Sequence, residues 1–324
     1  MRQISLDAIT DAAKHVYQAA VRTPLIKLDL PFPSGGAPAP DVYLKLESLQ
    51  PIGSFKIRGA WNAVRKLTPE QMKDGVWTVS AGNAAQGVAF AARLAGVPCS
   101  VMVMDTAPET KLRSIERLGA TIVKAGYDEC WQTVEAHASP RMRGHFVHPF
   151  DDDDFIAGNA TAGLEILEDL PDVDAVVAAL GGGGLLAGIG TVMRAKKPGV
   201  RVYAAEPETA APLDLSLRRG EACRFDGWKP SFVDGAGGQS VLPTMWPLLK
   251  DLVDGSIVMR LDEIASAMRK TADRVHVVAE GAGGAAIAAA LSGRAGPGKI
   301  VAVVSGGNID LSRFSELVSA HANV

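Results

Sequence analysis

The chain has 324 residues, of which 47% are hydrophobic and 21% charged, and its formal net charge is -3. This composition is typical of a globular protein large enough for two lobes, and it excludes a predominantly disordered chain. The positive residues are scattered, so we expect neither nucleic acid nor a membrane surface as a partner, but a small molecule.

Helix and strand patterns alternate from the N-terminus to the C-terminus. Apolar spacing predicts helices at residues 6–20, 56–67, 86–94, 110–118, 155–167, 261–275 and 282–291. Strands are predicted at residues 42–47, 76–80, 99–104, 121–123, 172–180, 201–205 and 300–304. This alternation indicates the α/β class, with parallel sheets covered by helices.

Cysteine usage and the N-terminal sequence bear on location. Cys99, Cys130 and Cys223 are widely spaced and form no CxxC pair, which indicates a reducing compartment. Acidic residues precede any apolar region at the N-terminus, so we expect no signal peptide and predict a cytoplasmic location. Residues 175–193 are uncharged, but four consecutive glycines among them disfavour a membrane helix.

The glycine run, Gly181 to Gly184, follows a predicted strand and precedes a predicted helix. Free backbone N–H groups and the helix dipole at such a position favour an anion, for example a phosphate. The run also fits a dinucleotide fingerprint, Gly182-x-Gly184-x-x-Ala187, with Glu206 about 20 residues further on to bind a ribose. A turn without a ligand is disfavoured by the entropic cost of four glycines.

A second segment, GSFKIRG from Gly53 to Gly59, contains Lys56. Its glycines allow the backbone to approach a ligand closely, and Phe55 can lie against an aromatic ring. A lysine partly buried at a helix start has a lowered pKa and a nucleophilic amine, which suits a Schiff base. A nicotinamide enzyme has no evident use for this arrangement, so the two segments together favour pyridoxal phosphate.

Four motifs occur in the order seen in fold-type II pyridoxal-phosphate enzymes. They are GSFKIRGA from Gly53, SAGNAAQGVA from Ser80, GGGGL from Gly181 and SGGNID from Ser305. The chain therefore resembles that family, and it is most similar to the threonine/serine dehydratase and serine racemase branch. The resemblance covers nearly the whole chain.

The resemblance implies a two-lobed fold like that of the tryptophan synthase β subunit. The large cofactor-binding domain would comprise residues 1–73 and 151–324, and the small substrate-side domain residues 74–150. Pyridoxal phosphate is expected between the lobes, because ligands of open α/β sheets collect at such crevices. An amino-acid substrate and a homodimer are implied as well.

The resemblance also implies roles for individual residues. Lys56 matches the Schiff-base lysine, which also moves protons at the substrate Cα, and Phe55 matches the residue packed beside the pyridine ring. Asn83 matches the partner of the cofactor's phenolic oxygen, and Ser305 the hydroxyl partner of the pyridine nitrogen. The phosphate is expected on Gly181, Gly182, Gly183, Gly184 and Leu185. The substrate carboxylate is expected on Ser80, Ala81, Gly82, Asn83 and Ala84.

Departures from the family pattern narrow the chemistry. Many dehydratases and racemases read SSGNH where this chain reads SAGNA from Ser80. In racemases the residue matching Ala81 is the acid/base opposite the lysine, and a methyl group cannot exchange a proton, so racemisation is not expected. Ala84 replaces an imidazole and opens space for a bulkier β-hydroxy amino acid. A neutral hydroxyl at Ser305 leaves the pyridine nitrogen less basic, which favours β-elimination.

Two acidic residues have open roles. Glu206 matches a ligand of a divalent cation in some relatives, but Pro212 stands where a second carboxylate is expected, with Asp214 as a substitute. Hard cations need several oxygen ligands, so Glu206 is a candidate ligand without a predicted metal site. Glu280 matches an acidic position near the active site and either orients groups or caps a helix.

The sequence therefore predicts a pyridoxal-phosphate-dependent lyase. It is an amino-acid dehydratase, or ammonia-lyase, that eliminates water from a threonine-like or serine-like substrate and releases a 2-oxo acid and ammonia. An amino-acid racemase or a β-replacement synthase of the same fold is the first alternative. A nicotinamide-dependent oxidoreductase and a non-catalytic pyridoxal-phosphate carrier are the more distant ones.

Overall fold

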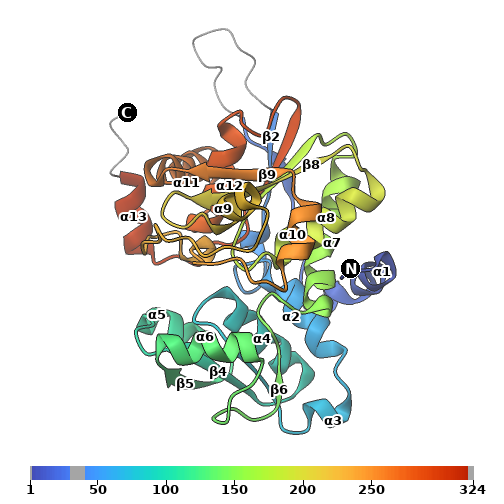
Figure 1. Ribbon diagram of the computed structural model, residues 1–324, viewed down its shortest axis with the longest axis vertical. Helices are drawn as coiled ribbons and strands as arrows, with labels where there is room; N and C mark the ends of the chain where they lie inside the picture. Colours follow the sequence, from blue (N-terminus) through green and yellow to red (C-terminus); the bar gives the residue numbers. More distant parts are fainter. Residues whose placement is uncertain (1, 30–40, 320–324) are drawn as a thin grey trace. The chain divides into compact units, whose positions relative to one another are not determined.

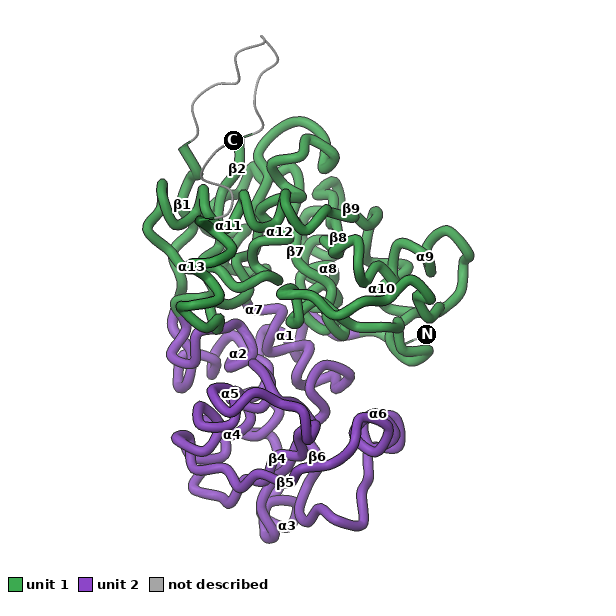
Figure 2. Tube along the Cα trace, turned by 90° about the vertical axis from the view of Figure 1, so that its left-hand side faces the viewer, with its two compact units in different colours: residues 1–3, 22–49, 162–324 green, residues 4–21, 50–161 purple. Residues whose placement is uncertain are grey.

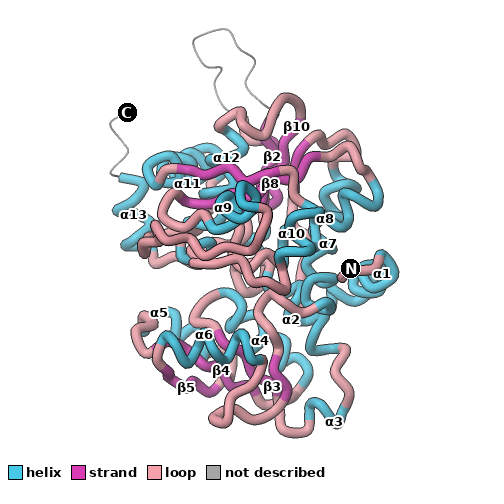
Figure 3. Tube along the Cα trace, in the orientation of Figure 1, coloured by secondary structure: helices cyan, strands magenta, loops and turns pink. Residues whose placement is uncertain are grey.

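The structure is a computed structural model that describes residues 2–29 and 41–319 (Figure 1). The chain divides into two compact units, unit 1 with residues 1–3, 22–49 and 162–324 and unit 2 with residues 4–21 and 50–161 (Figure 2). Both units combine a sheet with helices (Figure 3), so the predicted α/β class is confirmed. The described helices all fall short of the length and hydrophobicity that a membrane span requires.

Unit 1 contains a six-stranded sheet in the order β1-β2-β10-β7-β8-β9. Its strands are β1 (Leu25–Lys27), β2 (Asp41–Lys45), β7 (Ala175–Ala179), β8 (Arg201–Pro207), β9 (Gly255–Met259) and β10 (Lys299–Val303). β1 pairs antiparallel with β2, and the other pairs are parallel. The helices are η2 (Glu47–Leu49), α8 (Gly184–Lys196), α9 (Pro212–Arg219), η3 (Asp234–Ala236), α10 (Trp246–Leu252), α11 (Leu261–Val275), α12 (Gly281–Leu291) and α13 (Leu311–Ser319).

Strand β7 is buried on both faces of this sheet. Ala175, Val177 and Ala179 join an apolar cluster with residues of α11 and α12. Val176 and Ala178, which are also fully buried, point to the opposite face, where α8 contacts β7 and β8. A strand covered on both faces must be apolar throughout, which explains the uncharged run that precedes the glycines.

Unit 2 contains a four-stranded parallel sheet in the order β5-β4-β3-β6. Its strands are β3 (Val76–Val79), β4 (Cys99–Met104), β5 (Thr121–Ala125) and β6 (His145–Phe146). The helices are α1 (Leu6–His15), η1 (Val16–Gln18), α2 (Lys56–Arg65), α3 (Pro69–Met72), α4 (Asn83–Ala95), α5 (Glu109–Glu116) and α6 (Tyr127–Ala136); α7 (Asp153–Asp169) continues into unit 1. The predicted small domain, residues 74–150, lies within unit 2, and its boundaries stay a prediction.

The two faces of the unit 2 sheet carry different helices. Val101 and Val103 of β4 belong to an apolar cluster with α2, α4 and α5. Met102, which points the other way, packs with Cys130 and Val134 of α6. Helix α2 lies close to α4, because a Cβ at Gly87 of α4 would stand only 3.1 Å from the Lys56 carbonyl oxygen. This close packing fixes the backbone from which the Lys56 side chain projects.

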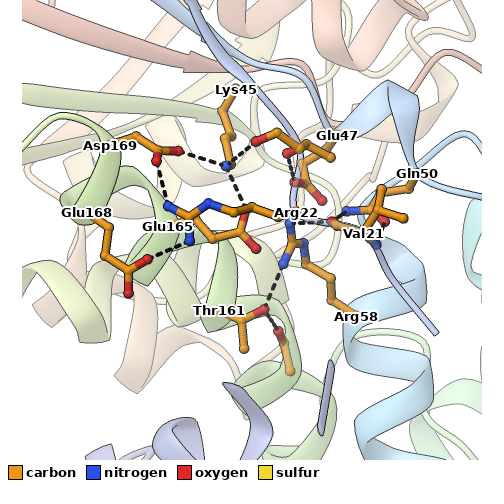
Figure 4. A network of polar contacts seen from close by, with 12 residues as sticks. Val21, Arg22, Lys45, Glu47, Gln50, Arg58, Thr161, Glu165, Glu168 and Asp169 are labelled. Atoms are coloured by element: carbon orange, nitrogen blue, oxygen red, sulfur yellow. Dashed lines mark hydrogen bonds and ion pairs between the residues drawn. The ribbon is translucent and has the colours of Figure 1, made fainter. Parts of the chain in front are cut away.

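Buried charges fasten β2 of unit 1 to the part of α7 in the same unit (Figure 4). Lys45 is fully buried, and its Nζ lies 2.6 Å from Oε2 of Glu165 and donates a 2.7 Å hydrogen bond to the Thr23 carbonyl oxygen. Arg22, whose side chain is 43% exposed, donates to Asp169 of the same helix. Removing one partner of a buried ion pair costs about 3–5 kcal/mol, so loss of Lys45 or Glu165 alone should destabilise the attachment of β2 to α7.

Candidate active site

Lys56 is the first residue of α2, and its amine is enclosed although the residue as a whole is half-buried. Nζ donates a 2.5 Å hydrogen bond to the carbonyl oxygen of Pro149, and it lies 5.3 Å from the ring centres of Phe55 and Phe155. Burial lowers the pKa of Lys56 to about 8. An amine with this pKa is partly unprotonated near neutral pH, which suits both nucleophilic attack and proton transfer.

The turn before α2 delivers Lys56 without a capping side chain. Gly53 has a φ of 71° and donates from its N–H to the Gln50 carbonyl oxygen at 2.7 Å. Phe55 already has helical φ and ψ angles, and its carbonyl oxygen accepts from the Arg58 N–H at 3.0 Å. A residue with a side chain at Gly53 would strain this left-handed conformation, so the glycine sets where the helix begins.

Residues 80–82 connect β3 to α4 in the same unit, and residues 83 and 84 open the helix. Ser80 Oγ accepts a 3.1 Å hydrogen bond from the Gly82 N–H, and Asn83 is the first residue of α4. The predicted helix therefore begins three residues earlier than expected. The first-turn N–H groups of a helix have no acceptor within it, so this turn fits a carboxylate.

Unit 2 brings this turn and Lys56 together. Gly87, one turn beyond Asn83, packs against the Lys56 carbonyl oxygen. Ala81 is half-buried against the apolar cluster of α2 and α4, and Ala84 is buried. Neither alanine offers a group that can transfer a proton.

The glycine run follows β7 and opens α8 in unit 1. Gly183 occupies the N-cap position with a φ of 93°, and a Cβ there would lie 2.8 Å from Cδ1 of Leu249. A Cβ at Gly181 would lie 2.8 Å from the carbonyl oxygen of Gly235. A side chain at Gly181 would thus clash with backbone and one at Gly183 would be strained by its φ, so the backbone N–H groups at the start of α8 are left to bind an anion. The arrangement fits a phosphate.

The other predicted residues of unit 1 lie at the same edge of the sheet, because β10 is the parallel neighbour of β7. Ser305 follows β10 and is buried. The Glu280 N–H donates to the Gly306 carbonyl oxygen at 3.0 Å, and a Cβ at Gly235 would lie 3.4 Å from Oε1 of Glu280. Gly235, in the glycine-rich DGAGG run at residues 234–238, was not among the predicted residues and lies beside both Gly181 and Glu280.

Glu280 and Glu206 have different local roles. Glu280 stands at the N-cap position of α12 but makes no capping hydrogen bond with its side chain. Glu206 is fully buried in β8, and its carboxylate accepts from the N–H groups of Leu213 and Asp214 at 2.9 and 2.8 Å and from Ser256 Oγ at 2.5 Å. It therefore caps α9 from outside the helix.

The Glu206 contacts bear on the predicted cation ligand. Both carboxylate oxygens already accept hydrogen bonds, and the Asp214 carboxylate bonds Arg218 at 3.0 Å. Pro212 is the first residue of α9 and offers no carboxylate. The carboxylate oxygens of Glu206 and Asp214 therefore fit a hard cation poorly, because such an ion needs several oxygen ligands that are not already used in hydrogen bonds. As a cation ligand, Glu206 stays a prediction.

The predicted site residues thus fall into two groups. Unit 2 holds Phe55, Lys56, Ser80, Ala81, Gly82, Asn83 and Ala84. Unit 1 holds Gly181, Gly182, Gly183, Gly184, Leu185, Glu206, Glu280 and Ser305. All members of a group therefore belong to the same unit.

Comparison with known proteins gives a consistent result. The family described as pyridoxal-phosphate dependent enzyme matches residues 16–306. An L-threonine ammonia-lyase of Thermotoga maritima is 39% identical over 98% of this chain and 78% of its own length. A catabolic L-threonine dehydratase of Staphylococcus aureus is 35% identical over 99% of this chain and 94% of its own. The structure of maize serine racemase matches with a TM-score of 0.86 at 29% identity, covering 99% of this chain and 98% of that one.

Proposed function

We propose that this chain, which belongs to the family of pyridoxal-phosphate dependent enzymes, eliminates water from L-threonine or a closely related β-hydroxy amino acid. The chain is a pyridoxal-phosphate-dependent lyase of the amino-acid dehydratase class, because relatives 35% and 39% identical over nearly all of it are L-threonine dehydratases or ammonia-lyases. The predicted family, fold and reaction class are thereby confirmed. The nicotinamide alternative is set aside.

The setting of Lys56 carries the proposal for the chemistry. Its amine is enclosed by Phe55, Phe155 and the Pro149 carbonyl oxygen, and burial lowers its pKa to about 8. Such an amine can join the cofactor and later take a proton from the substrate Cα. Lys56 is the only residue to which we assign a catalytic role.

In the elimination, the cofactor and the protein have different roles. Bound pyridoxal phosphate supplies an electron sink that stabilises negative charge at the substrate Cα. Lys56 takes the Cα proton, the electron pair of the broken C–H bond forms the Cα–Cβ double bond, and the Cβ–O bond breaks. The β-hydroxyl group leaves as water with the proton that Lys56 returns to it. The enamine that results tautomerises and hydrolyses to a 2-oxo acid and ammonia.

We assign the cofactor contacts from the match of these positions to the family. The N–H groups of the glycine run and Leu185 bind the phosphate, which the start of α8 and the steric exclusion of side chains support. Phe55 packs beside the ring, Asn83 bonds the phenolic oxygen, and Ser305 bonds the ring nitrogen. A neutral hydroxyl at Ser305 supports elimination, because it holds less negative charge in the ring than a carboxylate partner would.

The turn at residues 80–84 receives the substrate carboxylate in this proposal, as the first turn of α4 supports. Ala81 provides no second acid or base, so we favour elimination over the racemase alternative. Ala84 is buried and small, so substrates larger than serine at Cβ fit this reading.

We further propose that the enzyme acts as a homodimer in the cytoplasm. All three cysteines are unpaired and buried, which agrees with a reducing compartment. Light scattering of the purified protein measures the oligomeric state, and a monomeric mass would overturn the dimer.

One experiment tests the central assignment. Protein loaded with pyridoxal phosphate is reduced with borohydride, and peptide mapping should place the label on Lys56. Ammonia and 2-oxo acid are then measured with L-threonine, L-serine and larger β-hydroxy amino acids. A label elsewhere, or cofactor binding without ammonia release from any of them, would sink the proposal; the second result would favour a non-catalytic carrier.

A further inference from the structure

His148 organises the backbone that carries the hydrogen-bond partner of Lys56. Its Nδ1 accepts from the N–H groups of Phe150 at 3.2 Å and Asp151 at 2.7 Å. Asparagine and aspartate shape tight turns through the same pattern, a side-chain acceptor for N–H groups two and three residues on. The turn lies in unit 2, and within it the Pro149 carbonyl oxygen accepts from Nζ of Lys56.

Aromatic contacts hold the His148 ring in this orientation. The ring is only 2% exposed, and it meets Phe150 edge-on with centroids 4.6 Å apart. Phe146 lies edge-on at 5.6 Å, and His137 at 4.8 Å with a tilt of 48°. Rotation of the imidazole away from the backbone would disrupt this packing, so Nδ1 stays directed at its two donors.

The same hydrogen bonds determine which ring nitrogen carries the proton. An Nδ1 that accepts two N–H groups must keep its lone pair, so the neutral ring carries its hydrogen on Nε2. Nδ1 of His148, whose lone pair is used by these two N–H groups, is then unsuited to a metal, although ligand atoms of His137, His148 and Asp151 lie within 4.8 Å of one another.

His148 also stays neutral over the working range of an enzyme. Burial lowers its pKa to about 3; Asp151 acts in the opposite direction, and His137 and Lys56 reinforce the lowering. Nδ1 therefore remains an acceptor at every ordinary assay pH, and the turn does not open by protonation.

We propose that His148 is a positioning residue for the reaction. By accepting two backbone N–H groups at Nδ1, it holds the Pro149 carbonyl oxygen against Nζ of Lys56 and keeps that amine in its enclosed position between Phe55 and Phe155. In this role His148 acts through the backbone, because the hydrogen bonds at its Nδ1 come from the N–H groups of Phe150 and Asp151. This inference rests on the proposed role of Lys56.

A matched pair of variants isolates the acceptor. In His148→Asn the side-chain oxygen is attached to Cγ, as Nδ1 is, so it can accept the same two N–H groups. His148→Leu has nearly the shape of the asparagine variant but no acceptor. If the leucine variant does not fold, His148→Gln replaces it, because its amide oxygen is one bond too far out.

The measurement is the pH dependence of competitive labelling of Lys56 in cofactor-free protein. Wild type and His148→Asn should show a midpoint near 8, the pKa that burial produces. In His148→Leu or His148→Gln the released side chain moves toward solvent, and the midpoint should rise toward the ordinary 10.5 by about one unit. Labelling at pH 8 should then be about fivefold slower.

Two results would overturn the inference. One is a His148→Leu or His148→Gln protein with a wild-type labelling profile, whatever its thermal stability. The other is a His148→Asn protein that shifts as much as the leucine variant, because the acceptor would then not matter. Borohydride labelling of loaded wild-type protein separately tests the proposed function, since it does not depend on His148.

Discussion

The glycine run of unit 1 and Lys56 of unit 2 both lie where a helix begins, but they use different parts of the chain. At the start of α8, Gly183 has a φ of 93°, a conformation that disfavours any side chain, so backbone N–H groups are what this turn offers to the proposed phosphate. At the start of α2, one side chain carries an amine whose pKa burial lowers to about 8. Function at the glycine run should therefore be sensitive to any added side chain. Function at Lys56 should be sensitive to loss of the amine or to a change in its protonation.

The largest effect is expected where one side chain does the chemistry. Lys56→Ala removes the amine that we propose joins the cofactor and moves the Cα proton, so ammonia release from L-threonine should fall by about 10³-fold or more. Lys14→Ala, which changes an exposed lysine of α1 in the same unit, should retain wild-type activity. If Lys56→Ala retained more than a few per cent of wild-type activity, the amine of Lys56 would not be required for the reaction.

The backbone region should respond to a single methyl group. Gly183→Ala strains a φ of 93° and brings Cβ against Leu249, so we expect the Kd for pyridoxal phosphate to rise about 10- to 100-fold, which is about 1.4–2.7 kcal/mol. Gly199→Ala is the control, because no atom lies within 4 Å of the added Cβ. Equal cofactor affinity in both variants, measured by titration of the visible band, would contradict the volume argument.

Burial also shifts the pKa of an acid, Glu206 in unit 1, in the direction opposite to that of Lys56. Burial raises its pKa to about 7 from 4.5, so between these values the folded state binds a proton that the unfolded state has lost. The free energy of unfolding should therefore fall as pH rises from about 5 to 8, by about 1–3 kcal/mol from this group.

The control for this linkage is Glu206→Gln, which keeps most of the shape but cannot titrate. Its urea unfolding curves should lose that part of the pH dependence. A slope with pH that is the same in wild type and Glu206→Gln would show that Glu206 does not titrate differently in the two states.

The smallest expected effect concerns substrate size. Ala84→His restores an imidazole near the substrate turn and fills space, so activity on β-hydroxy amino acids larger than threonine should fall about three- to tenfold relative to L-serine. The ratio of kcat/KM values for the two substrates measures this. Ala95→Ser, at the far end of α4, is the control. An unchanged ratio in Ala84→His would show that Ala84 does not set the pocket size.

Sequence patterns predicted the strongly periodic elements and missed the weak ones. The strand Cys99–Met104 and the helix Leu261–Val275 have the predicted bounds, because an apolar run and an amphipathic stripe mark them clearly. β9 was missed although Ile257 and Met259 are buried, because it is a short edge strand that begins with Gly255 and Ser256, two residues that do not indicate a strand. The predicted helix at residues 6–20 instead ends at His15 and continues as the 3-10 turn Val16–Gln18.

Site residues, too, could be predicted where a local sequence pattern marks them and not where distant residues define their role. Lys56 and the glycine run could be found because their chemistry is local, a lysine between glycines and four glycines after a buried strand. The capping role of Glu206 could not, because its donors include Ser256, which the sheet brings beside it from β9. A carboxylate that looks like a ligand in sequence can thus be occupied by backbone N–H groups in the fold.

The sequence by itself determined which groups this protein offers for the proposed chemistry: one lysine in a glycine-flanked segment, a backbone run without side chains and a turn at residues 80–84 without a second base. The tertiary structure decided how reactive the lysine is. Its lowered pKa results from burial, and the Pro149 carbonyl oxygen and Phe155 that enclose Nζ come from residues more than ninety positions away. No local pattern encodes that distance, because desolvation depends on what packs around a group and not on what precedes it in the chain.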